Sequence, residues 1–135
     1  FYGSFMYLFG RMAPRYDVTI VPGISSLMAS AAVLESPLAS RNDLLTVIPA
    51  PLEESVLTNA IAAADSVAII KIGRHLTKVC RVLKNLERLD TAKYVAYATM
   101  TKQTIKPLNE TSKQRAPYFS IILSLSKISF SFLLA

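Results

Sequence analysis

Hydrophobic residues recur along this chain with the periods of helices and strands. Their spacing of three and four predicts helices over 4–15, 52–64 and 76–88. A further helix is predicted over 25–34, where nearly every residue is apolar or small, so we expect it to be buried on most sides. Short β-branched or apolar runs predict strands over 17–21, 44–48, 66–72, 93–99 and 118–123. This alternation of helices and strands is typical of an α/β fold.

Two segments carry more detailed predictions. In the third helix, Leu52, Val56 and Ala60 share one face, which we expect to point toward the core. The stretch between the last two predicted strands is polar, and we expect a turn region there.

The last eighteen residues, 118–135, are hydrophobic enough to resemble a membrane helix. Lys127 stands near the centre of this stretch, where a lysine costs about 2.5–3.5 kcal/mol on insertion into a bilayer. Ile128, Phe130 and Phe132 alternate with serines, which fits the period of a strand. The sequence therefore favours a strand over a membrane span.

The junction between strand 17–21 and helix 25–34 is the first candidate site. Pro22-Gly23 is a turn signal, and Ser25 or Ser26 can cap the helix that follows. In open α/β sheets, ligands collect beyond the carboxyl ends of strands. A purely structural helix cap gives the same pattern, so that alternative stays open.

The charged residues are unevenly distributed. Residues 1–70 carry three basic and six acidic side chains, whereas 71–135 carry twelve basic and three acidic ones, a balance of −3 against +9. The cationic half favours an anionic partner, such as a polycarboxylate, a nucleic acid or an anionic membrane. Lys71, Arg74 and His75 directly follow the most apolar strand and could hold a substrate carboxylate. A solvated basic face is the alternative.

The rarity of cysteine and histidine excludes several kinds of site. Cys80 is the single cysteine, which excludes an internal disulfide framework and favours a reducing compartment. His75 is the single histidine, so a zinc centre of histidine and cysteine lacks ligands, and we expect no metal. The sequence has no Gly-x-Gly-x-x-Gly, no Gly-Lys-Ser/Thr phosphate loop and no Gly-x-Ser-x-Gly elbow. The sequence therefore gives little support to a hydrolase or a kinase.

A set of short motifs occurs in a specific order along residues 1–123. They are Phe1-Tyr2-Gly3-Ser4-Phe5, Val21-Pro22-Gly23-Ile24-Ser25-Ser26-Leu27-Met28-Ala29, Arg41-Asn42-Asp43, Lys71-Ile72-Gly73-Arg74-His75, Ala98-Thr99-Met100 with Gln103, and Ala116-Pro117-Tyr118-Phe119-Ser120. Together and in this order they resemble the tetrapyrrole methylases, and most closely those members that act at C20 of precorrin-2 in cobalamin biosynthesis.

The resemblance implies a two-domain α/β enzyme with S-adenosylmethionine (SAM) in the cleft between the domains. Residues 1–38 would end an N-terminal α/β domain, 39–123 would form a C-terminal α/β domain with a mixed sheet, and 124–135 would be a divergent tail. By motif, the family's SAM contacts map onto Phe1, Ser25, Ser26, Ile72 and Ala98. Many such contacts use the backbone or the local shape, so these side chains need not be polar.

The implied reaction is methyl transfer to C20 of precorrin-2 or cobalt-precorrin-2. An electron-rich carbon of a reduced tetrapyrrole can attack the sulfonium methyl of SAM directly, so no catalytic side chain is assigned. We expect catalysis by positioning, with about 3–3.5 Å between methyl and carbon. Lys71 and Arg74 would bind carboxylates of the substrate. We further expect a cytoplasmic enzyme, a homodimer at full length, and neither a nucleic-acid nor a membrane partner.

The chain also departs from the family pattern. The glycine-rich first loop and the Gly-Asp-Pro stretch expected before Phe1 are not found in it. We therefore expect an N-terminally truncated methylase that binds SAM poorly and transfers no methyl group on its own. Three alternatives stay open: a methylase of the same superfamily acting at another ring position, a nucleic-acid-binding module using helix 76–88, and a membrane-associated adaptor using residues 118–135.

Overall fold

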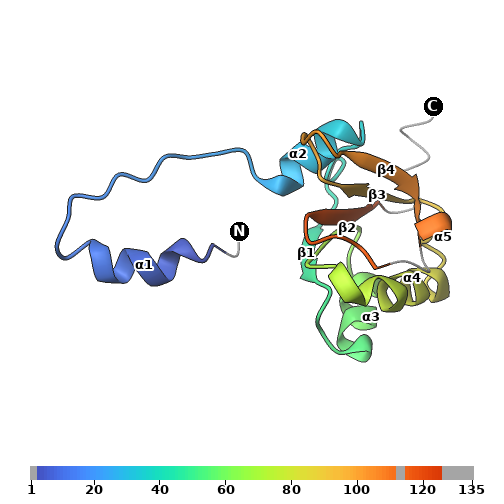
Figure 1. Cartoon of the computed structure of the whole chain (residues 1–135). Helices are drawn as coiled ribbons and strands as arrows, with labels where there is room; N and C mark the ends of the chain where they lie inside the picture. Colours follow the sequence, from blue (N-terminus) through green and yellow to red (C-terminus); the bar gives the residue numbers. More distant parts are fainter. Residues whose placement is uncertain (1–2, 112–114, 126–135) are drawn as a thin grey trace.

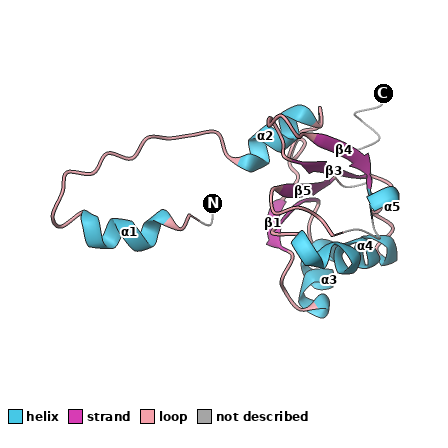
Figure 2. Ribbon diagram, in the orientation of Figure 1, coloured by secondary structure: helices cyan, strands magenta, loops and turns pink. Residues whose placement is uncertain are grey.

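In the part of the chain that the structure describes, five strands form one mixed sheet with helices on both of its faces (Figure 1 and Figure 2). The computed structural model describes residues 3–111 and 115–125. α3 (Glu54–Ala62) and α4 (Leu76–Asn85) cover one face, and α2 (Ser26–Val33) covers the other. Across the sheet the strands are β1 (Leu45–Pro49), β2 (Ser66–Ile70), β5 (Ser120–Ser124), β3 (Ala92–Ala96) and β4 (Thr104–Pro107). The predicted α/β fold with a mixed sheet is confirmed.

The strand directions place three carboxyl ends at one edge of the sheet. β1 and β2 are parallel, while β5 lies between β2 and β3 and is antiparallel to both. β1, β2 and β3 therefore share one direction, and their carboxyl ends lie beside the start of β5. We call this edge the carboxyl edge. Ligands of open α/β sheets collect there.

Alternate residues of each strand face opposite layers, and both layers are apolar. Ile69 and Ile122 are fully buried in the cluster that includes the inner faces of α3 and α4. Ala68 and Ile121 are buried on the other face, in the cluster that contains Leu27 of α2. Burial on both faces explains why β2 and β5 read as continuous apolar runs rather than as alternating ones.

α2 is less buried than its composition predicts. Leu27 and Ser30 are buried, but Met28 is 59% exposed. One side of the helix packs on the sheet and the other faces solvent, so the prediction of burial on most sides is wrong. The small residues of α2 allow it to pack closely on the sheet, but no other described element packs on its opposite side.

α3 turns a different face to the core from the one predicted. Leu57 and Ile61 are fully buried, whereas Val56 is half exposed. Leu52 and Ala60 only flank the buried cluster. Leu57 and Ile61 form their own stripe four residues apart, and these larger aliphatic side chains remove more apolar area from water.

α4 matches its amphipathic pattern. Leu76, Val79 and Leu83 are buried, and Leu86 packs beside them just after the helix. Cys80 is also buried, and burial raises the pKa of its thiol to about 11. The thiol is therefore protonated near pH 7 and unsuited to act as a nucleophile.

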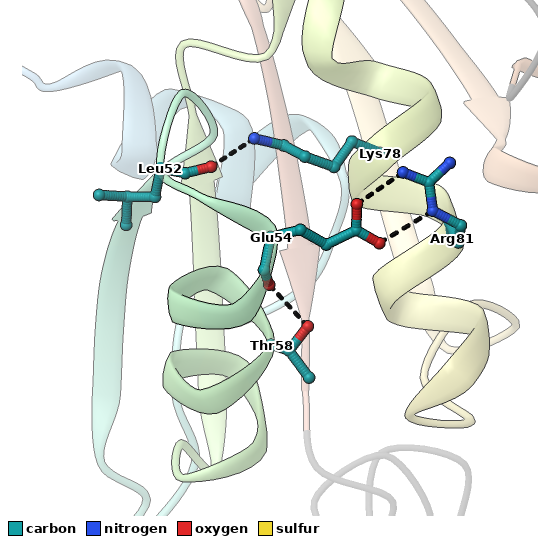
Figure 3. A network of polar contacts seen from close by, with 5 residues as sticks. All are labelled: Leu52, Glu54, Thr58, Lys78 and Arg81. Carbon is teal, nitrogen blue, oxygen red and sulfur yellow. Dashed lines mark hydrogen bonds and ion pairs between the residues drawn. The ribbon is translucent and has the colours of Figure 1, made fainter.

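A polar network joins the exposed sides of α3 and α4 (Figure 3). The Arg81 guanidinium donates to both carboxylate oxygens of Glu54, at 2.9 and 2.6 Å. Lys78 donates to the Leu52 carbonyl, and the Thr58 hydroxyl donates to the Glu54 carbonyl at 2.8 Å. The Arg81 and Glu54 side chains are 54% and 42% exposed, so water screens their ion pair and it adds little stability.

Arg88 connects the end of α3 to β5. Its guanidinium donates to the carbonyls of Ile61, Ala64 and Asp65 at 2.9, 2.8 and 2.8 Å. It also donates to the hydroxyl and the carbonyl of Ser124, both at 3.0 Å. All five N–H groups of the side chain thus have acceptors. Ile61 and Ala64 lie at the carboxyl end of α3, where carbonyls lack helical partners, so Arg88 caps this helix from outside.

The strand predicted at 17–21 is absent. Residues 17–24 have no regular secondary structure, and no hydrogen bond joins them to another described residue. They connect α2 to α1 (Phe5–Met12), which stands away from the sheet (Figure 1). A strand needs a neighbour to pair its backbone groups, and none of the described strands lies beside this segment. α1 itself confirms the first predicted helix, at narrower bounds.

The structure has a strand and a short helix where the sequence predicts only a polar turn region. β4 pairs antiparallel with β3, and α5 (Leu108–Thr111) follows it. β4 contains Lys106 and Pro107, and its Ile105 is half exposed, so no apolar alternation marks it. Such residues on an edge strand discourage pairing with another sheet.

The remaining strand predictions are confirmed within two or three residues at each end by β1, β2, β3 and β5. Lys127 and the alternating pattern at Ile128, Phe130 and Phe132 lie outside the described residues. Within the described part of the chain, no helix has both the length and the apolar character needed to cross a membrane. The domain boundaries after residues 38 and 123 stay predictions.

Candidate functional site

Three loops meet at the carboxyl edge. Residues 71–75 follow β2, residues 97–103 follow β3, and residues 115–119 lead into β5 between them. The Ala116 amide donates to the Gly73 carbonyl at 3.1 Å, and the Tyr97 amide donates to the Phe119 carbonyl at 2.7 Å. The segment leading into β5 is therefore hydrogen-bonded to the loops on both sides.

The N-terminus of α2 is directed toward the same edge. Near the start of β3, the Lys93 ammonium donates to the carbonyl of Leu34 at the far end of α2, at 3.1 Å. Leu27 in the first turn belongs to the same apolar cluster as Ala98, which lies just beyond β3. α2 thus runs from the carboxyl edge back toward the opposite edge.

Ser25 and Ser26 begin α2 at this edge. The Ser25 hydroxyl accepts a hydrogen bond from the Met28 amide at 3.4 Å, so Ser25 is the N-cap, as the sequence predicts. Ser26 is exposed and Ser25 is half-buried. The two serines present polar groups next to the positive end of a helix dipole.

Of the residues predicted to contact SAM, the structure brings three to one side of the carboxyl edge. Ser25, Ser26 and Ala98 all belong to the α2 side of the sheet. Ile72 follows β2 at the same edge, but its side chain is fully buried in the cluster on the α3 and α4 side. Only its backbone could face a ligand. Phe1 lies outside the described residues.

Cationic side chains follow β2 at the carboxyl edge. Lys71 and Arg74 are exposed, and His75 is half-buried. The pKa of His75 lies below its usual value of 6.5. Burial is the largest cause, and the nearby positive charges of Lys78 and Arg74 lower the pKa further. His75 is therefore mostly neutral at pH 7, and the positive charge in this group belongs to Lys71 and Arg74.

We predict that the imidazole of His75 titrates below pH 6.5 in the folded protein, which NMR can follow through its chemical shifts. The unfolded chain then binds more protons, so stability rises with pH, and the part owed to His75 is lost as pH falls from about 6.5 through the folded value. Arg74→Gln should raise the pKa slightly by removing a neighbouring charge. A value of 6.5 or above in the wild-type chain would contradict the prediction.

The backbone is strained at this edge. Lys71, Tyr97 and Thr99 have φ values of 56°, 53° and 65°, in the left-handed region that side-chain-bearing residues rarely adopt. Each costs roughly 1–3 kcal/mol, which the surrounding structure must offset. The side-chain oxygen of Gln103 accepts a hydrogen bond from the Thr99 amide at 2.7 Å, which holds this loop in place. Strain of this kind is concentrated at functional sites.

Exposed aromatic side chains complete the edge. Tyr118 is 83% exposed and Phe119 is 55% exposed. Their rings are 5.1 Å apart, edge to face, and Phe119 also lies 6.3 Å from the ring of Tyr97. The hydrophobic pattern does not reveal this cluster, because Tyr118 and Phe119 fit the predicted strand 118–123. The sequence signal that marks them is the motif Ala116-Pro117-Tyr118-Phe119-Ser120.

A cavity of 590 Å³ lies at the opposite edge of the sheet, and it is not the predicted site. Its lining includes Leu34, Lys93, Lys106 and Asn109, from the end of α2, the start of β3, the end of β4 and α5. None of the predicted ligand-binding residues lines it. The carboxyl edge, by contrast, is built from loops that follow β2 and β3 and lead into β5. Within residues 3–111 and 115–125, no group of three histidine, cysteine, aspartate or glutamate side chains is placed to hold a metal ion.

The fold and its carboxyl edge define an α/β domain of the kind that holds ligands beyond its strands. A family profile described as Tetrapyrrole (Corrin/Porphyrin) Methylases matches residues 1–112. The chain belongs to this family of tetrapyrrole methylases, which confirms the interpretation drawn from its motifs.

Individual relatives agree with this assignment. A precorrin-2 C(20)-methyltransferase from Sinorhizobium sp is 37% identical over 123 residues, covering 91% of this chain and 50% of the relative. The chain therefore spans about half the length of that curated relative.

Solved structures support the fold. A cobalt precorrin-4 methyltransferase superposes with a TM-score of 0.76 at 22% identity, over 96% of this chain and 60% of that one. A uroporphyrin-III C-methyl transferase from Thermus thermophilus, complexed with S-adenyl homocysteine, gives a TM-score of 0.58 at 20% identity, over 91% of this chain and 57% of that one.

Proposed function

We propose that this chain is part of a SAM-dependent C-methyltransferase of cobalamin biosynthesis, which methylates precorrin-2 or cobalt-precorrin-2 at C20. The observation that carries the proposal is the 37% identity to a precorrin-2 C(20)-methyltransferase over 91% of the chain. A related methylase acting at another ring position is the second candidate, because solved structures of similar fold act on other tetrapyrroles.

SAM would lie against the α2 side of the carboxyl edge. Ser25, Ser26 and Ala98 would contact it, Ile72 would contribute through its backbone, and Phe1 is assigned by motif alone. The fit is supported by two features: the exposed hydroxyl of Ser26 at a helix N-terminus, and a small side chain at Ala98, which leaves room for a ligand. The S-adenyl homocysteine in the Thermus structure supports a ligand of this class.

When bound, SAM would supply an electrophilic methyl group to the nucleophilic carbon of the tetrapyrrole, with the S–CH3 bond breaking and S-adenosylhomocysteine as the leaving group. The task of this chain is then to hold the substrate in line and to exclude water. Lys71 and Arg74 would bind carboxylates of the substrate through charge-assisted hydrogen bonds. The exposed rings of Tyr118 and Phe119 would pack against its macrocycle. Buried Cys80 has no part in this mechanism.

The cellular setting is also part of the proposal. The partner is a tetrapyrrole substrate, the full-length enzyme is a homodimer in the cytoplasm, and neither a nucleic acid nor a membrane is a partner. The nucleic-acid alternative has little support on α4, because Lys78 and Arg81 are already engaged with Leu52 and Glu54.

A calorimetric titration with SAM tests the proposal first. We expect the chain as given to bind SAM weakly, with a Kd above about 1 mM, because Ser25, Ser26 and Ala98 supply contacts from one side of the carboxyl edge only. Micromolar binding would contradict this expectation.

A chimera in which this chain replaces the matched half of the Sinorhizobium relative tests the activity. It should add one methyl group to precorrin-2, detected by mass, and NMR should place that methyl at C20. A methyl at another carbon would favour the second candidate, and no transfer by a folded chimera that binds SAM would contradict the proposal.

A further inference from the structure

The loop that joins β3 to β4 lies at the carboxyl edge and spans residues 97–103. Its base is closed by the sheet, because Ala96 at the end of β3 pairs with Thr104 at the start of β4. The Gln103 amide also donates to the Met100 carbonyl at 2.9 Å. Gln103 therefore stands directly before β4 on a backbone that is fixed on both sides.

Side chains hold the peptide group between Ala98 and Thr99 in this loop. The N–H of that group donates to the side-chain oxygen of Gln103 at 2.7 Å, and its carbonyl accepts from the Thr99 hydroxyl at 2.6 Å. The Thr99 hydroxyl moves with the loop, whereas Gln103 is anchored at the base of the loop. Gln103 is thus the side chain that orients this peptide group relative to the sheet.

The conformation of Thr99 depends on such support. Its φ of 65° lies in the left-handed region, which is unfavourable for a β-branched residue. Without an acceptor for its N–H group, Thr99 would turn toward an ordinary backbone conformation, and Ala98 would move with it. Ala98 packs against the cluster that contains Leu27 of α2, beside the helix start that Ser25 caps. The hydrogen bond to Gln103 therefore fixes the part of the loop that faces α2.

We propose that Gln103 is a positioning residue for SAM, which holds the Ala98–Thr99 peptide group in the conformation that the methyl donor contacts. The inference rests on the proposed function, because the contact between Ala98 and SAM belongs to it. Gln103 acts through the loop and is assigned no contact with the reacting atoms. Its hydrogen bond lies at the surface, so its loss should alter the loop without unfolding the sheet.

Binding of S-adenosylhomocysteine to the chimera with the Sinorhizobium relative, measured by calorimetry, tests the inference without requiring methyl transfer. Gln103→Leu removes the acceptor and should raise the Kd about fivefold. Gln103→Glu keeps an acceptor oxygen at the same reach and should restore the Kd to within about twofold of the wild-type value. Equal Kd values for the wild-type and Gln103→Leu proteins would overturn the inference. A Gln103→Glu variant that binds as weakly as Gln103→Leu would also overturn it.

Amide exchange followed by NMR shows whether the loop is the cause. In the chain as given, the Thr99 amide should exchange about fivefold faster in Gln103→Leu than in the wild type or in Gln103→Glu, because its acceptor is gone. A weaker Kd in Gln103→Leu with unchanged exchange at Thr99 would overturn positioning through this peptide group.

Thr58→Val is the matched control. It removes a side-chain hydrogen bond of similar length, 2.8 Å to the Glu54 carbonyl, from α3 on the opposite face of the sheet from Ala98. It should therefore change the Kd by less than about twofold. If Thr58→Val weakens binding as much as Gln103→Leu does, the effect is a general loss of stability and the inference is overturned.

The inference and the proposed function can fail separately. A chimera that shows the expected changes in Kd but transfers no methyl group to precorrin-2 would count against the proposed function and leave the role of Gln103 standing. A chimera that methylates C20 with the same KM for SAM in the wild-type and Gln103→Leu forms would support the function and overturn the inference.

Discussion

Replacing Arg88 with alanine should lower the free energy of unfolding by about 3 kcal/mol. The guanidinium donates five hydrogen bonds, to carbonyls of Ile61, Ala64 and Asp65 and to two atoms of Ser124. Alanine would leave acceptors at the end of α3 and in β5 without partners inside the protein. Urea unfolding followed by circular dichroism measures the loss.

Arg81 on the same helix provides the control. Its ion pair with Glu54 is largely exposed, so Arg81→Ala should leave the unfolding midpoint nearly unchanged. Arg88→Lys should lose most of the stability that Arg88→Ala loses, because one ammonium cannot reach acceptors on both elements. If Arg88→Ala destabilises the protein no more than Arg81→Ala, the role of Arg88 as a cap is wrong.

The double variant Lys71→Glu, Arg74→Glu should raise the KM for precorrin-2 by at least about 100-fold in the active chimera. Each cation is proposed to make a charge-assisted hydrogen bond to a substrate carboxylate, and such bonds contribute about 1.5–3 kcal/mol each. The KM for SAM should change little, because the proposed SAM contacts lie on the α2 side of the edge. Steady-state kinetics with each substrate varied separately measures both effects.

A control with the same charge change is Lys84→Glu, Lys106→Glu. Lys84 lies near the end of α4, and Lys106 lies in β4 near the opposite edge of the sheet. If both double variants raise the KM equally, the effect is one of net charge, and Lys71 and Arg74 are not specific contacts.

The fold was predictable where one segment alone determines its structure. β2 is marked by a continuous apolar run, and α4 by an amphipathic stripe. Each pattern can be interpreted without knowing which element lies beside it. Residues 17–21 have an equally clear strand composition, yet they form no strand, because a strand exists only beside another one. β4 is the reverse case: Ile105 between polar neighbours gives no signal, and pairing with β3 makes the strand.

The candidate site was predictable only in part. The cap at Ser25 and the cations at Lys71 and Arg74 follow from local sequence. The left-handed backbone at Tyr97 and Thr99 does not, because neither residue type favours it and only the surrounding contacts impose it. The buried side chain of Ile72 shows a further limit: residues of one motif can follow the same strand and still face opposite layers.

Among the strands that the structure describes, β5 comes last in the sequence and lies in the middle of the sheet. While the protein is being synthesised, β1 with β2 and β3 with β4 leave the ribosome before the strand that joins them. The inner edges of β2 and β3 stay open to wrong pairing until residues 120–124 emerge. The sheet therefore closes only after residues 120–124 have emerged, and the newborn chain is most exposed to wrong pairing just before that stage.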